Sequence, residues 1–180
     1  MSTWGGPFLA AVALLAAAGA LKVVRPDTTA RALGQLGWPA SPTLVRAGAL
    51  GELIVAAGAL VGGGRPFAAL VAVSYLGFAA FVLAALRRGT PLATCGCFGA
   101  EDTPPTAVHL GVNLVAAAVA GIVALTGSGA GGLADITTME GSLLLRVAFL
   151  GSTAATVWLS YVALAVLPKL KAVPGAAVPR

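Results

Sequence analysis

The chain has 180 residues, of which 58% are hydrophobic and 9% are charged, and its formal net charge is +5. Soluble domains carry about 25% charged residues, so this chain lacks the polar side chains that a water-exposed surface needs. The basic residues flank apolar runs and form no stripe with interleaved aromatic residues, which argues against nucleic acid as a partner and predicts a lipid bilayer as the surroundings.

Five apolar segments are each long enough to cross a bilayer, which takes about 20 residues. Their frequent Ala and Gly residues suit close packing of helices in lipid. We therefore predict an all-α, polytopic membrane helical bundle. Residues 1–126 form a four-helix membrane domain, and residues 127–180 add an external loop, a fifth transmembrane helix and a short cytoplasmic tail. The five segments are Pro7–Val24, Leu44–Gly62, Pro66–Leu86, Ala107–Thr126 and Val147–Leu167.

The first segment has some features of a signal peptide, because Ala16-Ala17-Ala18 resembles a cleavage site. No basic side chain precedes it, however, and its apolar run is longer than a typical signal core. We expect a retained span, with cleavage as the alternative. Lys22 closes this segment, and we expect its side chain to extend to the lipid headgroups.

Residues 25–39 connect the first two segments and carry the signals of a short helix. Asp27 and Thr28 can cap it, Leu33 and Leu36 fall on one face, and Pro39 ends it. We predict an interfacial helix on the membrane surface, with Trp38 at the headgroup level. An irregular loop is the alternative, because the piece is short and rich in glycine.

The distribution of Lys and Arg predicts the orientation. In a five-span layout nine of these residues fall on one side, and Arg65 and Arg146 fall on the other. The positive side is expected to be cytoplasmic. This places the protein in the plasma (inner) membrane with its amino terminus outside and its carboxyl terminus in the cytoplasm.

The two cysteines of the chain lie in Thr94-Cys95-Gly96-Cys97-Phe98-Gly99, between the third and fourth segments. Glycine tolerates the tight backbone that a bond between Cys95 and Cys97 needs, and strain in so small a ring makes the bond reducible. We predict an exchangeable redox pair. A structural or permanently reduced pair is the alternative, and a metal site is disfavoured because two Cys and one His are short of the usual four zinc ligands.

The fourth segment begins with the single histidine of the chain, next to the cysteines. His109 and Asn113 lie four residues apart on one helical face. Glu52 lies in a segment that starts on the same side of the membrane, so all three can occupy the same half of the bilayer. We expect His109 to move protons, and Glu52 to face the bundle interior near His109 or Lys22, although packing roles are the alternatives. The spans could hold a quinone or haem, but one histidine without a further ligand motif is weak support for either, so we predict no cofactor.

Three motifs together resemble the methylamine utilisation protein MauE family, which is related to the DoxX-like membrane proteins. They are Gly19-Ala20-Leu21-Lys22, Gly51-Glu52-Leu53 and the Cys95-Gly96-Cys97 motif that precedes His109 and Asn113. The resemblance covers residues 8–126, and a fifth span departs from it. It implies a four-helix membrane bundle with a redox-associated role in maturing a secreted, disulfide-rich dehydrogenase of the methylamine type, together with a thioredoxin-like partner.

The leading hypothesis is therefore a membrane thiol–disulfide oxidoreductase whose site residues are Cys95, Cys97, His109 and Glu52. The alternative is a non-catalytic membrane scaffold or assembly subunit in which the cysteine pair is structural. One tension remains between the charge pattern and the resemblance. The charges place the cysteines on the cytoplasmic side, whereas the implied client matures outside, and the chain has no second cysteine pair to receive electrons.

Overall fold

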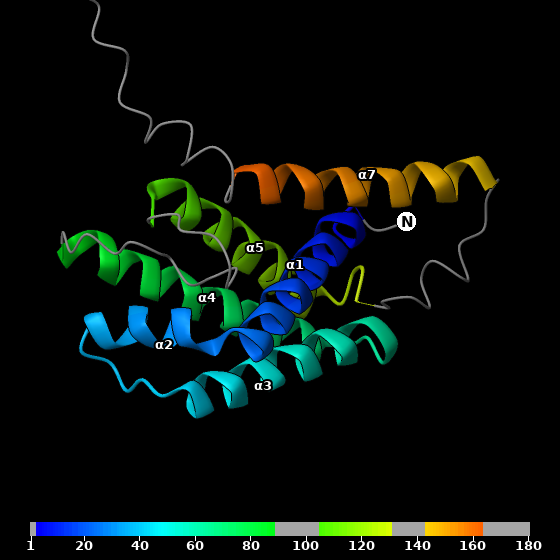
Figure 1. Ribbon diagram of the computed structural model, residues 1–180. Helices are drawn as coiled ribbons and strands as arrows, with labels where there is room; N and C mark the ends of the chain where they lie inside the picture. Colours follow the sequence, from blue (N-terminus) through cyan, green and yellow to red (C-terminus); the bar gives the residue numbers. More distant parts are fainter. Residues whose placement is uncertain (1–2, 89–104, 131–142, 164–180) are drawn as a thin grey trace, which may run out of the picture.

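The protein is described by a computed structural model, which places residues 3–88, 105–130 and 143–163. Four of the helices in these ranges, α1, α3, α4 and α5, are long and apolar enough to cross a membrane. The predicted all-α membrane bundle is confirmed. The helices are α1 (Gly5–Val24), α2 (Pro26–Gln35), α3 (Pro42–Val61), α4 (Arg65–Arg88), α5 (Ala107–Thr126) and α7 (Leu143–Tyr161) (Figure 1).

Local signals set the start of α3 and the turn that follows it. α5 has the bounds that hydropathy predicts, and α3 begins at Pro42, because the Ser41 hydroxyl accepts a hydrogen bond from the Leu44 amide at 3.1 Å. The turn from α3 to α4 contains Gly63 and Gly64, both with positive φ. Arg65 follows this turn and donates to two carbonyl oxygens in the last turn of α5, where backbone acceptors lack helical partners.

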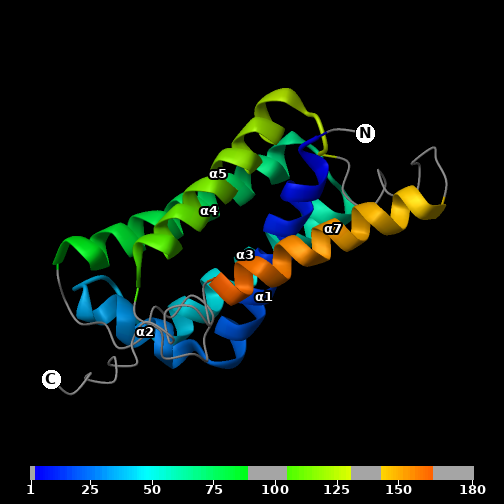
Figure 2. The same cartoon turned by 90° about the horizontal axis from the view of Figure 1, so that it is seen from above.

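The four long helices alternate in direction, so that the carboxyl ends of α1 and α4 lie near the amino ends of α3 and α5 (Figures 1 and 2). The first of them, α1, is the most buried candidate span. Its retention in the mature protein stays a prediction. Its apolar side chains pack against α3, α4, α5 and α7. The fully buried members of this core include Val12, Leu15, Val71, Ala120 and Val123.

Residues 26–35 form a helix, as predicted, and the alternative of an irregular loop is wrong. The helix begins at Pro26 and ends at Gln35, before Gly37 takes up a φ of 70°. Ala32 of this helix and Leu36 after it share a second small core with Val82 and Ala85 at the end of α4. Burial against α4 offsets the weak helix propensity of so short a segment.

The helix α7 packs on the outside of α1, near its amino end. The ring of Phe149 lies against Gly5 and Gly6, and a Cβ at Gly6 would lie 3.4 Å from that ring. The absence of side chains there lets the two helices approach closely. The expected fifth span stays a prediction, since α7 is not one of the four candidate spans and residues 164–167 lie outside the described part of the chain.

Candidate functional site

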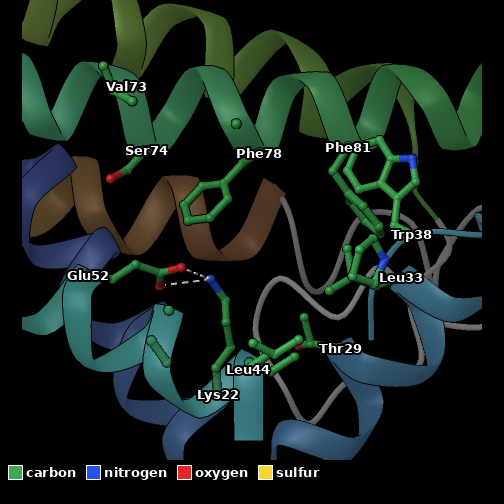
Figure 3. Close-up of a pocket in the computed structure, with 15 residues that line it drawn as sticks. Lys22, Thr29, Leu33, Trp38, Leu44, Glu52, Val73, Ser74, Phe78 and Phe81 are labelled. Atoms are coloured by element: carbon green, nitrogen blue, oxygen red, sulfur yellow. Dashed lines mark hydrogen bonds and ion pairs between the residues drawn. The ribbon is translucent and has the colours of Figure 1, made fainter. Parts of the chain in front are cut away.

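Lys22 and Glu52 form an ion pair between α1 and α3 (Figure 3). The Lys22 ammonium donates to both carboxylate oxygens, at 2.7 and 2.8 Å. The two side chains are 6% and 14% exposed. The expected interior position of Glu52 beside Lys22 is therefore confirmed. The expectation that Lys22 extends to the headgroups is wrong, because a carboxylate that lies 30 residues away in sequence neutralises it inside the bundle.

The pair depends on a close approach of two helices. At Gly19, one turn before Lys22, an added Cβ would lie 3.1 Å from the Ala49 carbonyl oxygen and 3.3 Å from the Cβ of Glu52. Only a residue without a side chain allows α1 and α3 this distance. The Gly-Ala-Leu-Lys motif at the end of α1 thus places Lys22 next to Glu52.

Aromatic residues of α4 complete the surroundings of the ion pair. The Lys22 nitrogen lies 4.1 Å from the centre of the Phe78 ring, within the range of a cation–π interaction. One turn earlier, the buried Tyr75 hydroxyl donates to the Ala11 carbonyl oxygen at 2.7 Å and ties α4 to α1. These contacts connect three of the four candidate spans, α1, α3 and α4.

A cavity of about 370 Å³ lies beside the ion pair. Its walls come from the end of α1, from α2 and the turn after it, from α3 and from α4 (Figure 3). The lining is mostly apolar. Leu44 and Val73 at its edge are 57% and 63% exposed, so in a bilayer this edge faces lipid. The sequence singled out Glu52 and Lys22 but not the cavity beside them, because the other walls come from elements that are far apart in the sequence.

His109 and Asn113 occupy the first turns of α5 and are buried. His109 is 2% exposed, and its Nδ1 lies 2.9 Å from the Thr106 hydroxyl oxygen. Asn113 donates from Nδ2 to the His109 carbonyl oxygen at 2.8 Å. Among the described residues, His109 does not line the cavity, and Glu52 is bonded to Lys22, so the structure brings Glu52 together with Lys22 and not with His109.

Comparison with known proteins identifies the family. The family described as Methylamine utilisation protein MauE matches residues 2–126, which is more than half of the chain. The chain belongs to the MauE family. Searches of curated proteins and of solved structures each find no match. The matched region contains all four candidate spans, the ion pair and both cysteines, and it ends before α7.

The cysteines of this MauE-family protein lie outside the described residues. Cys95 and Cys97 belong to the connection that leaves α4 after Arg88 and enters α5 at Ala107. Within the described ranges, no group of three or more His, Cys, Asp or Glu side chains is placed to hold a metal ion. The roles predicted for the cysteines, for His109 as a proton carrier and for Glu52 as a catalytic group therefore stay predictions.

Proposed function

We propose that this MauE-family membrane protein carries out thiol–disulfide exchange through Cys95 and Cys97. The observation that carries the proposal is the position of the thiols. Both lie within the family match, in the connection that precedes the helix whose first turn holds the buried His109. The family name ties the protein to methylamine utilisation. The proposed client is accordingly a maturing secreted enzyme with many disulfides, such as a methylamine dehydrogenase, with a thioredoxin-like protein as redox partner.

The proposed step exchanges two thiols for one disulfide. The thiolate of one cysteine attacks a disulfide sulfur of the partner, and one partner thiolate leaves. The second cysteine then attacks the mixed disulfide, which releases the partner as a dithiol and leaves Cys95 and Cys97 joined. Two electrons pass to the partner, and the two protons lost by the cysteines are taken up by the partner thiolates. The reverse sequence oxidises the partner.

His109 and Glu52 enter the proposal in different ways. His109 lies within the first turn of the helix that follows the thiols, so it is the group we assign to proton transfer from the attacking cysteine. Glu52 already accepts both of its bonds from Lys22. We propose that any part it has in exchange operates through that pair, and Glu52→Gln in the exchange assay tests it.

The exchange proposal is tested by trapping thiols in membranes with a mass-tagged alkylating reagent, over redox buffers of graded potential. We expect the wild-type pair to convert between dithiol and disulfide, and the client disulfides to be lost in Cys95→Ser/Cys97→Ser. Thr94→Ser, next to the pair, is the matched control and should change neither result. If the double variant abolishes co-purification with the client instead, the protein is an assembly scaffold with a structural cysteine pair.

The role of His109 is tested by the rate of thiol alkylation as a function of pH. The rate rises with pH in every variant, because only the thiolate reacts, so the profiles are compared between proteins. We expect His109→Gln to slow alkylation and to move the profile to higher pH, since the group assigned to accept the thiol proton is lost. Asn113→Ala alters the same helix start but keeps the imidazole, so its pH profile should match the wild type. Equal profiles for all three proteins would remove His109 from the mechanism.

We also propose a plasma (inner) membrane location with the amino terminus outside and the carboxyl terminus in the cytoplasm. The basic residues support it, since omitting the buried Lys22 from the count still leaves eight on one side against two on the other. A reporter fused after Arg180 should be active in the cytoplasm, and one inserted in residues 127–141 should be active outside. The opposite pair of readings would reverse the orientation.

A further inference from the structure

We propose that the cavity beside the Lys22–Glu52 pair binds the ring of a membrane-soluble quinone or quinol. The cavity binds such a ring whether or not the cysteines exchange. A metal ion requires a cluster of protein ligands, and the described residues contain no group of three or more His, Cys, Asp or Glu side chains placed to hold one. A quinone requires only a pocket, hydrogen-bonding groups and access from lipid. The sequence did not predict this site, because its walls come together only in the folded bundle.

The charges of the cavity favour an uncharged ligand. Among the described residues that line it, the charged side chains are those of the ion pair, and they neutralise each other at 2.7 Å. A ligand with a net charge would either compete for one member of this pair or lose its own hydration in a low-dielectric space, and both are costly. A fatty acid or a phosphate headgroup is therefore a poor fit, whereas a neutral ring that carries oxygen atoms fits.

The polar atoms at the cavity suit a group that changes between acceptor and donor. An ammonium has three N–H donors, and Lys22 uses two on Glu52, which leaves one for a ligand carbonyl. Two oxygens at the cavity can accept a hydrogen bond from a ligand hydroxyl. One is the carboxylate of Glu52, and the other is the hydroxyl of Ser74, whose own hydrogen is donated to the Leu70 carbonyl oxygen. A quinone presents the carbonyl and its reduced form presents the hydroxyl, so one site can hold both.

The size, lining and access of the cavity agree with a ring that carries a lipid tail. A volume of 370 Å³ lies at the lower end of the range for small-molecule sites. Phe78 lies next to the ion pair, and Trp38 and Phe81 form a T-shaped aromatic pair at the other end, with ring centres 6.0 Å apart (Figure 3). The exposed edge at Leu44 and Val73 gives an apolar tail a path into the bilayer.

Quinone binding also supplies an electron acceptor, which the proposed exchange lacks. This consequence rests on the proposed function. Oxidation of a dithiol to a disulfide releases two electrons and two protons. A quinone that takes up two electrons and two protons becomes a quinol, so the exchange balances without a second cysteine pair. The binding experiment below does not use the cysteines, so its failure and a failure of thiol exchange can be told apart.

Two glycines in the wall allow the cavity to be filled without a clash. A Cβ added at Gly77 of α4 or at Gly48 of α3 meets no atom within 4 Å, and both residues line the cavity. A leucine at either position therefore occupies the space of the ligand. Gly51 of α3 has the same open surroundings but does not line the cavity, so Gly51→Leu is the matched control. Leucine also favours a helix more than glycine does.

Binding is measured by quenching of tryptophan fluorescence with a short-chain alkyl benzoquinone and its quinol, using purified full-length protein in nanodiscs. Trp4→Phe/Trp158→Phe leaves Trp38, at the cavity, as the single tryptophan. We expect saturable quenching, weakened by about tenfold or more in Gly77→Leu and Gly48→Leu and unchanged in Gly51→Leu. A tenfold loss corresponds to 1.4 kcal/mol. A fatty acid with the same alkyl chain should not compete.

The opposite results would overturn the proposal. Non-saturable quenching that is equal in Gly77→Leu, Gly48→Leu and Gly51→Leu would mean that the quinone only dissolves in the bilayer. Displacement by the fatty acid would mean that the cavity is a site for acyl chains. A protein that retains Trp158 alone, far along α7, should show only non-saturable quenching. Size-exclusion profiles and helical circular dichroism select the variants that remain folded, and either cavity variant is sufficient for the test.

Discussion

Lys22 and Glu52 come from two helices and meet across the bundle, whereas Thr106, His109 and Asn113 bond within the first turns of one helix. The first contact joins residues 30 positions apart, and the second set joins residues three and four positions apart. The ion pair exists only while α1 and α3 approach at Gly19. The cluster at the start of α5 forms with its helix and depends less on neighbours.

This difference bears on function. A pair that spans two helices beside a cavity can respond to a ligand, because small shifts of α1 or α3 alter its distance. A cluster held by its own helix keeps its geometry while the rest of the bundle adjusts. The two proposals divide along this difference: ligand binding is proposed at the ion pair, and proton transfer at the start of α5.

The largest effect is expected from breaking the ion pair. Glu52→Ala leaves the ammonium of Lys22 buried without its carboxylate, which costs about 3–5 kcal/mol in comparable buried pairs. Lys22→Met/Glu52→Leu removes both charges and keeps the apolar volume, so it should lie close to the wild type in stability. Unfolding curves in mixed detergent measure both. Equal destabilisation of the single and double variants would mean that packing, and not charge, is lost.

A smaller effect is expected where the contact between helices is neutral. Tyr75→Phe removes the hydroxyl that donates to the Ala11 carbonyl oxygen and keeps the ring. A hydrogen bond of this kind contributes about 1 kcal/mol. The same unfolding assay should show a loss of that size, well below that of Glu52→Ala. A loss as large as that of the charge variant would show that contact across the bundle matters more than the charges do.

The smallest effect is expected at the start of α5. Asn113→Ala removes a bond to the His109 carbonyl oxygen from the same helix. We expect a loss of about 0.5 kcal/mol, because contacts between residues four apart on a helix contribute only a few tenths. A larger loss in the free energy of unfolding than that of Tyr75→Phe would mean that Asn113 stabilises contacts beyond its own helix. The start of α5 would then depend on its neighbours as the ion pair does.

The sequence by itself determined the helices. A chain in lipid has to satisfy its backbone hydrogen bonds within each segment, so a long apolar run becomes a helix whatever it packs against. The bounds of α5 follow from hydropathy alone, whereas α3 begins two residues earlier than hydropathy predicts, at Pro42 after the Ser41 cap, and ends one residue earlier, at Val61. The positions of His109 and Asn113 on one face follow from their spacing, because helical periodicity is local.

Only the tertiary structure decided which buried groups meet. The rule that a lysine near a helix end extends to the headgroups failed for Lys22, because it takes no account of a carboxylate on another helix. The cavity could not be predicted either, since its walls come from four elements that meet only in the folded bundle. A local pattern specifies a helix and its faces, but the free energy of burying a charge depends on whatever the fold places opposite it.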